Sequence, residues 1–253
     1  MEKRRTDRGK PNRSMSKNRT YFVSDLHMFA RRSTAEQHVG EIQKRARRAE
    51  NFVLGGDIFD FRWSTLQCTN RTLDAATDWL DSLVRSAPDC KFHFLMGNHD
   101  HHDLMIKRLE SLSGVHHNLS WDPYLLRLCE SVFLHGDAAD VDATHQRLVQ
   151  SRENPRHHHP RGQTASTAYE VVLRTGIHRS VPVVAYPKRR TAKRLLRYLN
   201  EVGHGKESGV RHVYFGHTHR PLDAYRHDGI EFHNGGAPIR GVPFRIVSAK
   251  SAR

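Results

Sequence analysis

Five short blocks rich in histidine and aspartate hold the residues best suited to chemistry, and four of them directly follow an apolar run. In chain order the blocks are Asp25-Leu26-His27, Gly56-Asp57-Ile58-Phe59-Asp60, Gly97-Asn98-His99-Asp100, His135-Gly136-Asp137 and Gly216-His217-Thr218-His219. Imidazole, carboxylate and amide oxygen, without thiolate, are donors that Mn²⁺, Zn²⁺ and Fe all accept in proteins. The blocks therefore predict a metal site built from nitrogen and oxygen ligands.

The number of donors favours two metal ions over one. The candidate ligands are Asp25, His27, Asp57, Asn98, His135, His217 and His219. This set is too large for a tetrahedral zinc with an open position, and it suits two ions about 3.5–4 Å apart that share one carboxylate. Two divalent ions carry more charge than the two aspartates of the set. The centre could therefore still bind a hydroxide and an anionic phosphoryl group.

The blocks can converge only if the elements before them end at the same place. Strands are expected at residues 19–24, 51–55, 91–96, 124–128 and 131–135, and helices at 35–49, 73–84 and 101–112. Short strands are expected again at 211–215, 222–227, 229–233 and 244–247. This alternation predicts an α/β fold in which helices cover a mixed sheet. Ligands of such sheets gather at the carboxyl ends of the strands.

An inserted segment, about 138–205, interrupts the strand pattern and is expected to form a partly helical cap. It contains His157-His158-His159 within a Pro- and Arg-containing run, which is typical of a solvated loop. It ends in a helix whose leucine stripe faces inward while Arg189, Arg190, Lys193, Arg194 and Arg197 face elsewhere. Two interpretations of this cationic face stay open: a solvated surface, or a contact with an anionic substrate or lipid headgroups.

Length and charge bound the class of protein. The chain has 253 residues, enough to bury a core, and contains no apolar run long enough to cross a bilayer. Residues 1–18 are expected to form a disordered basic arm, followed by one domain at 19–253. The basic start lacks the apolar segment of a signal peptide, so a cytoplasmic location is expected. The three cysteines lie far apart and are expected to be buried, reduced thiols.

The net charge of +14 favours anionic partners, among them nucleic acid, acidic lipid or a phosphorylated substrate. Residues 1–20 contribute much of this excess, with eight Lys or Arg against two acids. No RNA- or DNA-recognition motif accompanies the charge, so nucleic-acid binding has no support beyond it.

The blocks resemble the signature of the calcineurin-like metallophosphoesterase family. The segments SDLHM, GGDIFD, GNHD, LHGD and FGHTH match that signature completely, and the resemblance spans about residues 20–240. It implies two mixed β-sheets packed as a sandwich, flanked by helices, with a two-metal centre at one edge. Mn²⁺ is the metal that we expect most, with Zn²⁺ or Fe as alternatives.

The resemblance also implies a role for each matched residue. One ion would be held by Asp25, His27 and His219, and the other by Asn98, His135 and His217. Asp57 would bridge the two ions. His99 would protonate the leaving oxygen or steady the transition state, and Asp60 would orient it.

A narrower similarity points to UDP-2,3-diacylglucosamine hydrolases, which cleave a pyrophosphate at the membrane surface. It rests on HGDAADVDATHQR, on the inserted helical segment and on GHTHRP, but that branch generally has arginine where this chain has His99. It implies a nucleotide-sugar lipid as substrate and peripheral contact with the inner membrane.

The resulting prediction is a hydrolase of phosphoester or pyrophosphate bonds that uses attack by a metal-bound hydroxide. The alternatives are a nucleotide or nucleic-acid phosphodiesterase and a non-catalytic scaffold of the same fold. A scaffold can lose metal ligands, whereas all the candidate ligands and His99 are present here. Their presence favours an enzyme.

Overall fold

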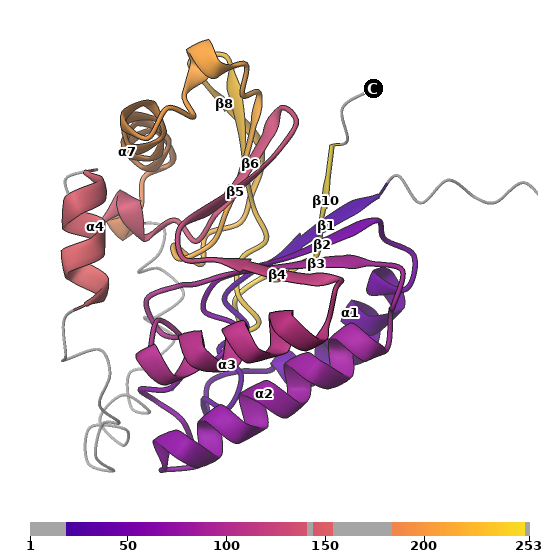
Figure 1. Ribbon diagram of the computed structural model, residues 1–253. Coiled ribbons are helices and arrows are strands. Elements are labelled where there is room, and N and C mark those ends of the chain that lie inside the picture. Colours follow the sequence, from indigo (N-terminus) through magenta and orange to yellow (C-terminus); the bar gives the residue numbers. More distant parts are fainter. Residues whose placement is uncertain (1–18, 141–143, 154–183, 251–253) are drawn as a thin grey trace, which may run out of the picture.

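A computed structural model describes residues 19–140, 144–153 and 184–250. Figure 1 shows two β-sheets packed face to face with helices outside them. The first sheet has the order β10-β1-β2-β3-β4, in which β1 to β4 are parallel and β10 is antiparallel to β1. Its strands are β1 (Thr20–Val23), β2 (Asn51–Gly55), β3 (Lys91–Leu95), β4 (Leu119–Asp122) and β10 (Val247–Ala249).

The second sheet has the order β5-β6-β7-β9-β8. Its central strands β6, β7 and β9 are parallel, and the edge strands β5 and β8 run antiparallel to their neighbours. Its strands are β5 (Leu125–Leu128), β6 (Ser131–Leu134), β7 (His212–Phe215), β8 (Leu222–His227) and β9 (Ile230–Asn234). Both sheets are mixed, which confirms the predicted α/β sandwich.

Three helices cover the outer face of the first sheet: α1 (Val39–Ala46), α2 (Thr69–Arg85) and α3 (Asp103–Val115). A short 3₁₀ turn, η1 (Ala35–His38), leads into α1. Each helix buries one apolar stripe; in α2, for example, Leu73, Ala76, Leu80 and Leu83 are all almost fully buried. Their spacing of three and four residues places them on one face, which packs against the sheet.

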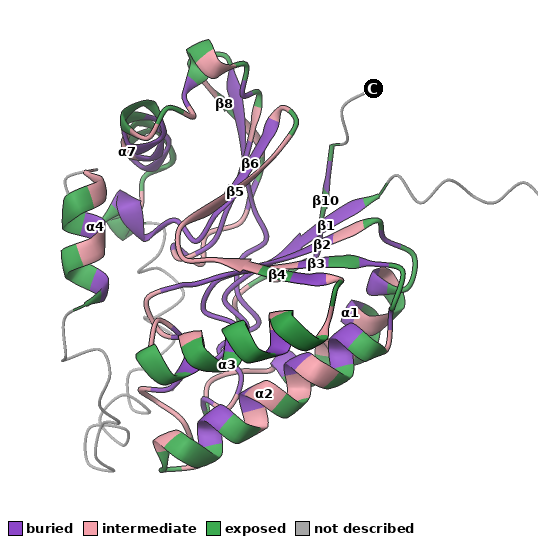
Figure 2. Cartoon of the chain, viewed as in Figure 1, coloured by how far each residue is buried: buried purple, intermediate pink, exposed green. Residues whose placement is uncertain are grey.

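A second apolar layer lies between the two sheets. Phe22 of β1 and Val53 of β2 point away from the helices and meet Phe133 and Tyr214 of the second sheet. The rings of Phe133 and Tyr214 stack with centroids 4.9 Å apart. Because side chains alternate along a strand, these strands bury both faces and read as nearly unbroken apolar runs. Figure 2 shows the central strands as largely buried.

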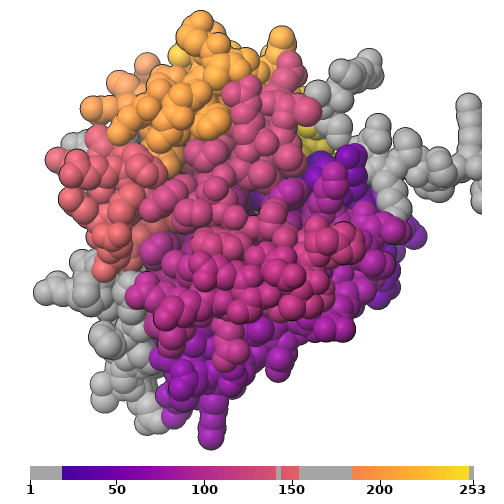
Figure 3. Space-filling model, viewed as in Figure 1, coloured from indigo at the N-terminus to yellow at the C-terminus, as the bar shows by residue number. Residues whose placement is uncertain are grey.

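The described part of the inserted segment forms helices α4 (His145–Arg152) and α7 (Lys188–Glu201), joined to the second sheet. Leu148 of α4 and Leu195 and Leu199 of α7 pack with Phe215 and Phe232 in one apolar cluster. The two helices adjoin each other on the outer side of that sheet (Figures 1 and 3). The basic arm, residues 1–18, and His157-His158-His159 lie outside the described residues, so the predicted domain boundaries stay predictions.

The structure differs from the expectations in three places. The sequence analysis missed β4, whose sequence Leu-Ser-Trp-Asp has no apolar run and of which only Leu119 is buried. The strand expected at 244–247 begins at Val247, because Phe244 instead makes an isolated bridge to Gly236. Two of the cysteines, Cys68 and Cys129, are exposed, contrary to prediction; both stand outside strands and helices.

In the described part of the chain, no helix combines the length and the apolar character needed to cross a membrane.

Candidate metal centre

The loops that follow five strands meet at one edge of the sandwich, as expected for the carboxyl ends of parallel neighbours. In the first sheet, the Asp25 N–H donates to the carbonyl of Gly56 at 3.0 Å, which joins the loops after β1 and β2. In the second sheet, the Gly216 N–H donates to the carbonyl of His135 at 2.7 Å, which joins the loops after β6 and β7. All seven candidate ligands lie on these joined loops or on the loop after β3.

Two buried carboxylates connect the loops through backbone N–H groups. The Asp25 Oδ1 accepts from the His217 N–H at 2.8 Å, across the boundary between the sheets. The Asp57 Oδ1 accepts from the His99 N–H at 2.8 Å, which links the loops after β2 and β3. These bonds fix the aspartate side chains before any ligand arrives, so the arrangement is preorganised.

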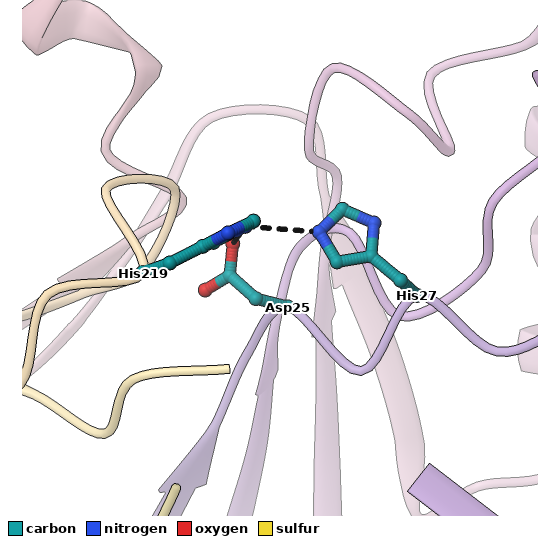
Figure 4. A group of neighbouring side chains, drawn as sticks. All are labelled: Asp25, His27 and His219. Carbon is teal, nitrogen blue, oxygen red and sulfur yellow. Dashed lines mark hydrogen bonds and ion pairs between the residues drawn. The ribbon is translucent and has the colours of Figure 1, made fainter. Parts of the chain in front are cut away.

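The first donor cluster consists of Asp25, His27 and His219 and is drawn in Figure 4. The Nε2 atoms of His27 and His219 face each other at 3.0 Å, and the His219 Nε2 lies 3.4 Å from the Asp25 Oδ1. Two imidazole nitrogens and a carboxylate oxygen that converge in this way form a ligand set for one metal ion.

The second donor cluster consists of Asn98, His135 and His217. The Asn98 Oδ1 lies 3.1 Å from the His135 Nε2 and 3.1 Å from the His217 Nδ1. The two imidazole nitrogens are 3.3 Å apart. An amide oxygen and two imidazole nitrogens thus point at one another from three different loops.

Asp57 lies between the two clusters. Its Oδ2 is 3.9 Å from the His27 Nε2 of the first cluster and 3.4 Å from the His135 Nε2 of the second. This is the position that a carboxylate shared by two ions requires. The geometry therefore brings all seven candidate ligands together at one edge of the sandwich.

Several ligand positions have a backbone conformation that is uncommon for residues other than glycine. The residues with positive φ, between +44° and +63°, include Asp25, His27, Asp57, His217 and His219. Such conformations cost of order 1–3 kcal/mol each and concentrate at functional sites. Aspartate and histidine adopt them more readily than bulky residues do, so the ligand types and the local backbone agree.

Two glycines are required by close approach. A side chain at Gly97 would overlap the carboxylate of Asp57, and one at Gly216 would overlap that of Asp25. Glycine at these positions lets the loops pass directly behind the two aspartates. This explains why glycine directly precedes Asn98 and His217 in their blocks.

The electrostatics of the centre favour bound cations. Asp25 and Asp57 are at most 2% exposed, and neither forms an ion pair with Lys or Arg within the described residues. Burial alone would raise the pKa of Asp57, but His135 and His99 hold it well below its usual range. Burial lowers the pKa of His135, yet Asp57 and the other nearby carboxylates raise it to about 10. The negative potential behind that rise also attracts divalent cations, so the residues present fit a metal centre.

His99 and Asp60 form a separate pair beside the first cluster. The His99 Nδ1 lies 3.1 Å from the Asp60 Oδ1, and Asp60 is fully buried. Burial lowers the pKa of His99, but the carboxylates of Asp60 and Asp57 outweigh it and raise the pKa above its usual value. His27, Asp60 and His99 also lie within metal-binding distance of one another. However, the Arg32 guanidinium lies 3.3 Å from the Asp60 Oδ2, so the carboxylate of this group is already paired with a positive charge.

Three residues support the site without having been predicted. Asp100 is buried and accepts from the Gly97 N–H at 2.6 Å and from the Ile58 N–H at 2.9 Å, so it clamps two ligand loops together. Arg32 contacts Asp60, and Asp140 contacts His217 at 2.7 Å. Asp100 stands inside a recognised block and could have been suspected. Arg32 and Asp140 have no spacing signal in the sequence.

Comparison with known proteins agrees with this geometry. The family model described as calcineurin-like phosphoesterase matches residues 19–221, most of the chain and all five blocks. No curated protein matches the chain. With its signature blocks, its two-sheet sandwich and its converging donors, the chain belongs to the calcineurin-like phosphoesterase family.

Proposed function

We propose that the protein is a phosphoesterase that holds two divalent metal ions and hydrolyses a phosphoester or pyrophosphate bond. The observation that carries the proposal is the position of the Asp57 Oδ2 between two complete donor clusters. A structural metal site would close its coordination shell, whereas two adjacent sites that share a carboxylate are typical of phosphoryl hydrolysis.

Mn²⁺ is the metal that we propose, with Zn²⁺ or Fe as alternatives, since imidazole, carboxylate and amide oxygen are donors that all three accept. When bound, the ions supply Lewis acidity that activates water and neutralises phosphoryl oxygens. The chain's own part is to hold the ligands rigid through the Asp25, Asp57 and Asp100 bonds to backbone N–H groups. Preorganised loops of this kind lower the cost of assembling the reacting groups.

His99 is the residue that we propose as general acid. Its imidazole is 16% exposed and lies beside the His27 ring, with centroids 4.9 Å apart, so it borders the first cluster on an accessible side. Asp60 accepts a hydrogen bond from the His99 Nδ1–H and stabilises the charged form of the ring. The Nε2 proton can then pass to the leaving oxygen as the P–O bond breaks, a contribution of about 10²–10⁴ in rate.

The surface of α7 carries cations that suit an anionic group distant from the metal centre, such as a lipid headgroup. A groove of about 510 Å³ is lined by Arg189, Lys193 and Arg197 together with Leu196, Asn200, His227 and Asp228, beside the β8–β9 turn at the end of the second sheet opposite the metal centre. None of these three cations forms an ion pair among the interactions of the described residues. Arg194, in contrast, donates a hydrogen bond to the carbonyl of Ala139 and is not counted with these three cations.

We therefore propose the narrower substrate class of a nucleotide-sugar lipid similar to UDP-2,3-diacylglucosamine, with peripheral contact to an anionic membrane surface. The support is the insertion of α4 and α7 in the chain between β6 and β7, and the three cations of α7 that have no ion pair within the described residues. The arginine that the related branch generally carries is His99 here, so the comparison with smaller esters decides between this class and other phosphoesters.

The test begins with metal-free protein reconstituted with Mn²⁺. We expect metal-dependent hydrolysis within a panel of p-nitrophenyl phosphate, bis(p-nitrophenyl) phosphate, nucleotides and UDP-sugar lipids, and its loss in Asp57→Ala. Preference for the UDP-sugar lipid would support the narrower proposal, and preference for a nucleotide would replace it by a nucleotide phosphodiesterase. Protein that carries two ions and hydrolyses no member of the panel would indicate a non-catalytic scaffold.

A further inference from the structure

His217 directs its two ring nitrogens to different partners. Its Nδ1 lies in the second donor cluster, 3.1 Å from the Asn98 Oδ1 and 3.3 Å from the His135 Nε2. Its Nε2 lies on the opposite side of the ring, 2.7 Å from the Oδ2 of Asp140. One ring nitrogen of His217 therefore points into the metal centre, and the other contacts a carboxylate outside it.

Asp140 belongs to the segment inserted between β6 and β7. It follows the 3₁₀ turn η2 (Asp137–Ala139), and its backbone N–H donates to the Asp137 carbonyl at 3.0 Å. The carbonyl of Ala139 in the same turn accepts from Arg194 of α7. Arg194 thus ties the carboxyl end of the turn to α7, which gives the Asp140 side chain a fixed origin beside His217.

Tyr186, from the stretch just before α7, encloses the same side of the ring. Its hydroxyl lies 3.5 Å from the His217 Nε2, and the two rings meet edge-on with centroids 5.9 Å apart. The hydroxyl also hydrogen-bonds to Asp140. Arg220 donates to the Tyr186 carbonyl at 2.7 Å, which anchors this stretch to the loop that carries His217.

A carboxylate can only accept a hydrogen bond, so the contact with Asp140 requires a proton on the His217 Nε2. The neutral ring then has its lone pair on Nδ1, directed at the second cluster. The opposite tautomer would place a proton among the metal ligands and leave two acceptors, Nε2 and the carboxylate, facing each other at 2.7 Å. Carboxylate–histidine–metal arrangements of this kind orient the ring and raise its basicity.

We propose that Asp140 is a positioning residue that fixes His217 in the tautomer able to bind a metal ion through Nδ1. The proposal rests on the metal centre of the proposed function and extends it to a residue outside the signature blocks. It also makes metal affinity at the second cluster depend on the inserted segment, since both Asp140 and Tyr186 come from that segment.

Two other ligand histidines also have oxygen partners on their far nitrogens. The His135 Nδ1 faces the carbonyl of Gly55 at 3.3 Å, and the His27 Nδ1 lies 3.4 Å from the buried carboxylate of Asp60. Those partners are buried in the sandwich, whereas the Asp140 side chain is 44% exposed. Asp140 can therefore be replaced without opening the core, which makes the proposal directly testable.

The experiment compares Asp140→Ala, Asp140→Asn and the distant control Asp78→Ala on the exposed side of α2. Titration calorimetry with Mn²⁺ on metal-free protein should show one of two sites weakened by about 10–100-fold in Asp140→Ala. Asp140→Asn should retain most of the affinity, because its amide oxygen still accepts from Nε2. Nitrogen NMR of the metal-free proteins should show His217 protonated at Nε2 in the wild type and in Asp140→Asn, and as a tautomer mixture in Asp140→Ala.

The result that would overturn the proposal is an Asp140→Ala protein with wild-type Mn²⁺ affinity and an unchanged His217 tautomer. An equal loss of affinity in Asp140→Asn and Asp140→Ala would also overturn it, since charge rather than the hydrogen bond would then be responsible. A wild type that binds no Mn²⁺ would refute the proposed function instead. In that case the NMR comparison of the metal-free proteins still decides the role of Asp140.

Discussion

Replacing Arg152 with Met should destabilise the protein by about 3–5 kcal/mol, because it breaks a buried ion pair by removing one partner. Arg152 is 1% exposed and forms two hydrogen bonds with the carboxylate of Asp137, at 2.7 and 2.8 Å. It also donates to the carbonyl of Pro123 and lies over the Tyr124 ring, 5.4 Å from its centroid. The pair holds α4 to the loop that follows His135.

The pKa of Asp137 indicates separately how much stability the ion pair with Arg152 contributes. Burial raises this pKa, but the Arg152 guanidinium outweighs burial and brings it to about 2 from an ordinary value of 3.8. A shift of that size corresponds to roughly 2–3 kcal/mol of stability above pH 4, lost as the pH falls through the lower value. In Arg152→Met the remaining carboxylate keeps the cost of burial without the attraction, so the loss at pH 7 should exceed this figure.

Urea unfolding followed by circular dichroism measures the loss, with Arg147→Met on the exposed side of α4 as the matched control, expected within about 0.5 kcal/mol of the wild type. The double variant Arg152→Met/Asp137→Leu replaces the pair by apolar groups and should regain at least half of the loss. A single variant that loses under about 1 kcal/mol, or a double variant no more stable than the single, would refute the assignment of the pair as the anchor of α4.

Three further predictions concern catalysis, substrate charge and pH. His99→Ala should keep its metals and lose about 10²–10⁴ in kcat on alkyl phosphoesters, with the smallest loss on p-nitrophenyl esters, whose leaving group needs no proton. Replacing Arg189, Lys193 and Arg197 with Gln should raise KM for an anionic lipid-linked substrate and leave small esters unaffected. His233 is buried with a pKa lowered to about 4, mainly by burial, so its neutral form stabilises the fold above pH 6.5 and this contribution is lost as the pH falls. Between pH 8 and pH 5 the free energy of unfolding should fall by about 2 kcal/mol for this reason. His233→Phe, which keeps the stacking on Tyr214, should remove this part of the pH dependence of unfolding.

For each of these three predictions, one result would contradict it. Equal losses of His99→Ala on alkyl and p-nitrophenyl esters would exclude a general acid and leave an electrostatic role on the phosphoryl oxygens. The control for α7 is a triple exchange to Gln of exposed cations on the other helical side, Arg48 just after α1, Arg71 of α2 and Lys107 of α3. An equal effect of both triples would exclude a local site. If the free energy of unfolding of His233→Phe falls between pH 8 and pH 5 as much as that of the wild type, groups other than His233 cause the loss of stability in acid.

The predicted fold followed from features that the sequence displays directly. Runs such as residues 51–55 and 91–96 are mostly apolar because most of their residues are buried on one face of the sheet or the other, so their positions were found almost to the residue. The edge strand β4 was missed because it needs little apolar character. The candidate ligands were found because each block follows a strand, and strand ends converge in parallel sheets.

The supporting contacts could not be read from the sequence. Asp140 and His217 are 77 residues apart, and Arg32 reaches Asp60 across 28 residues. Neither separation in the sequence corresponds to a helical or strand period, so only the tertiary fold brings these pairs together. Arg152 is a similar case, because a charged residue on a short helix is normally exposed. Its burial depends on Asp137, a residue that the sequence analysis treated only as part of a metal-ligand block.

The central claim is a two-ion centre in which Asp57 is the shared ligand, and metal content tests it most directly. Metal-free wild type reconstituted with Mn²⁺ and freed of excess metal should contain about two ions per chain by elemental analysis. Asp57→Ala should lose both ions or hold them far more weakly, while its circular dichroism stays that of the wild type. A folded wild type that retains one ion or fewer per chain after reconstitution would contradict the claim.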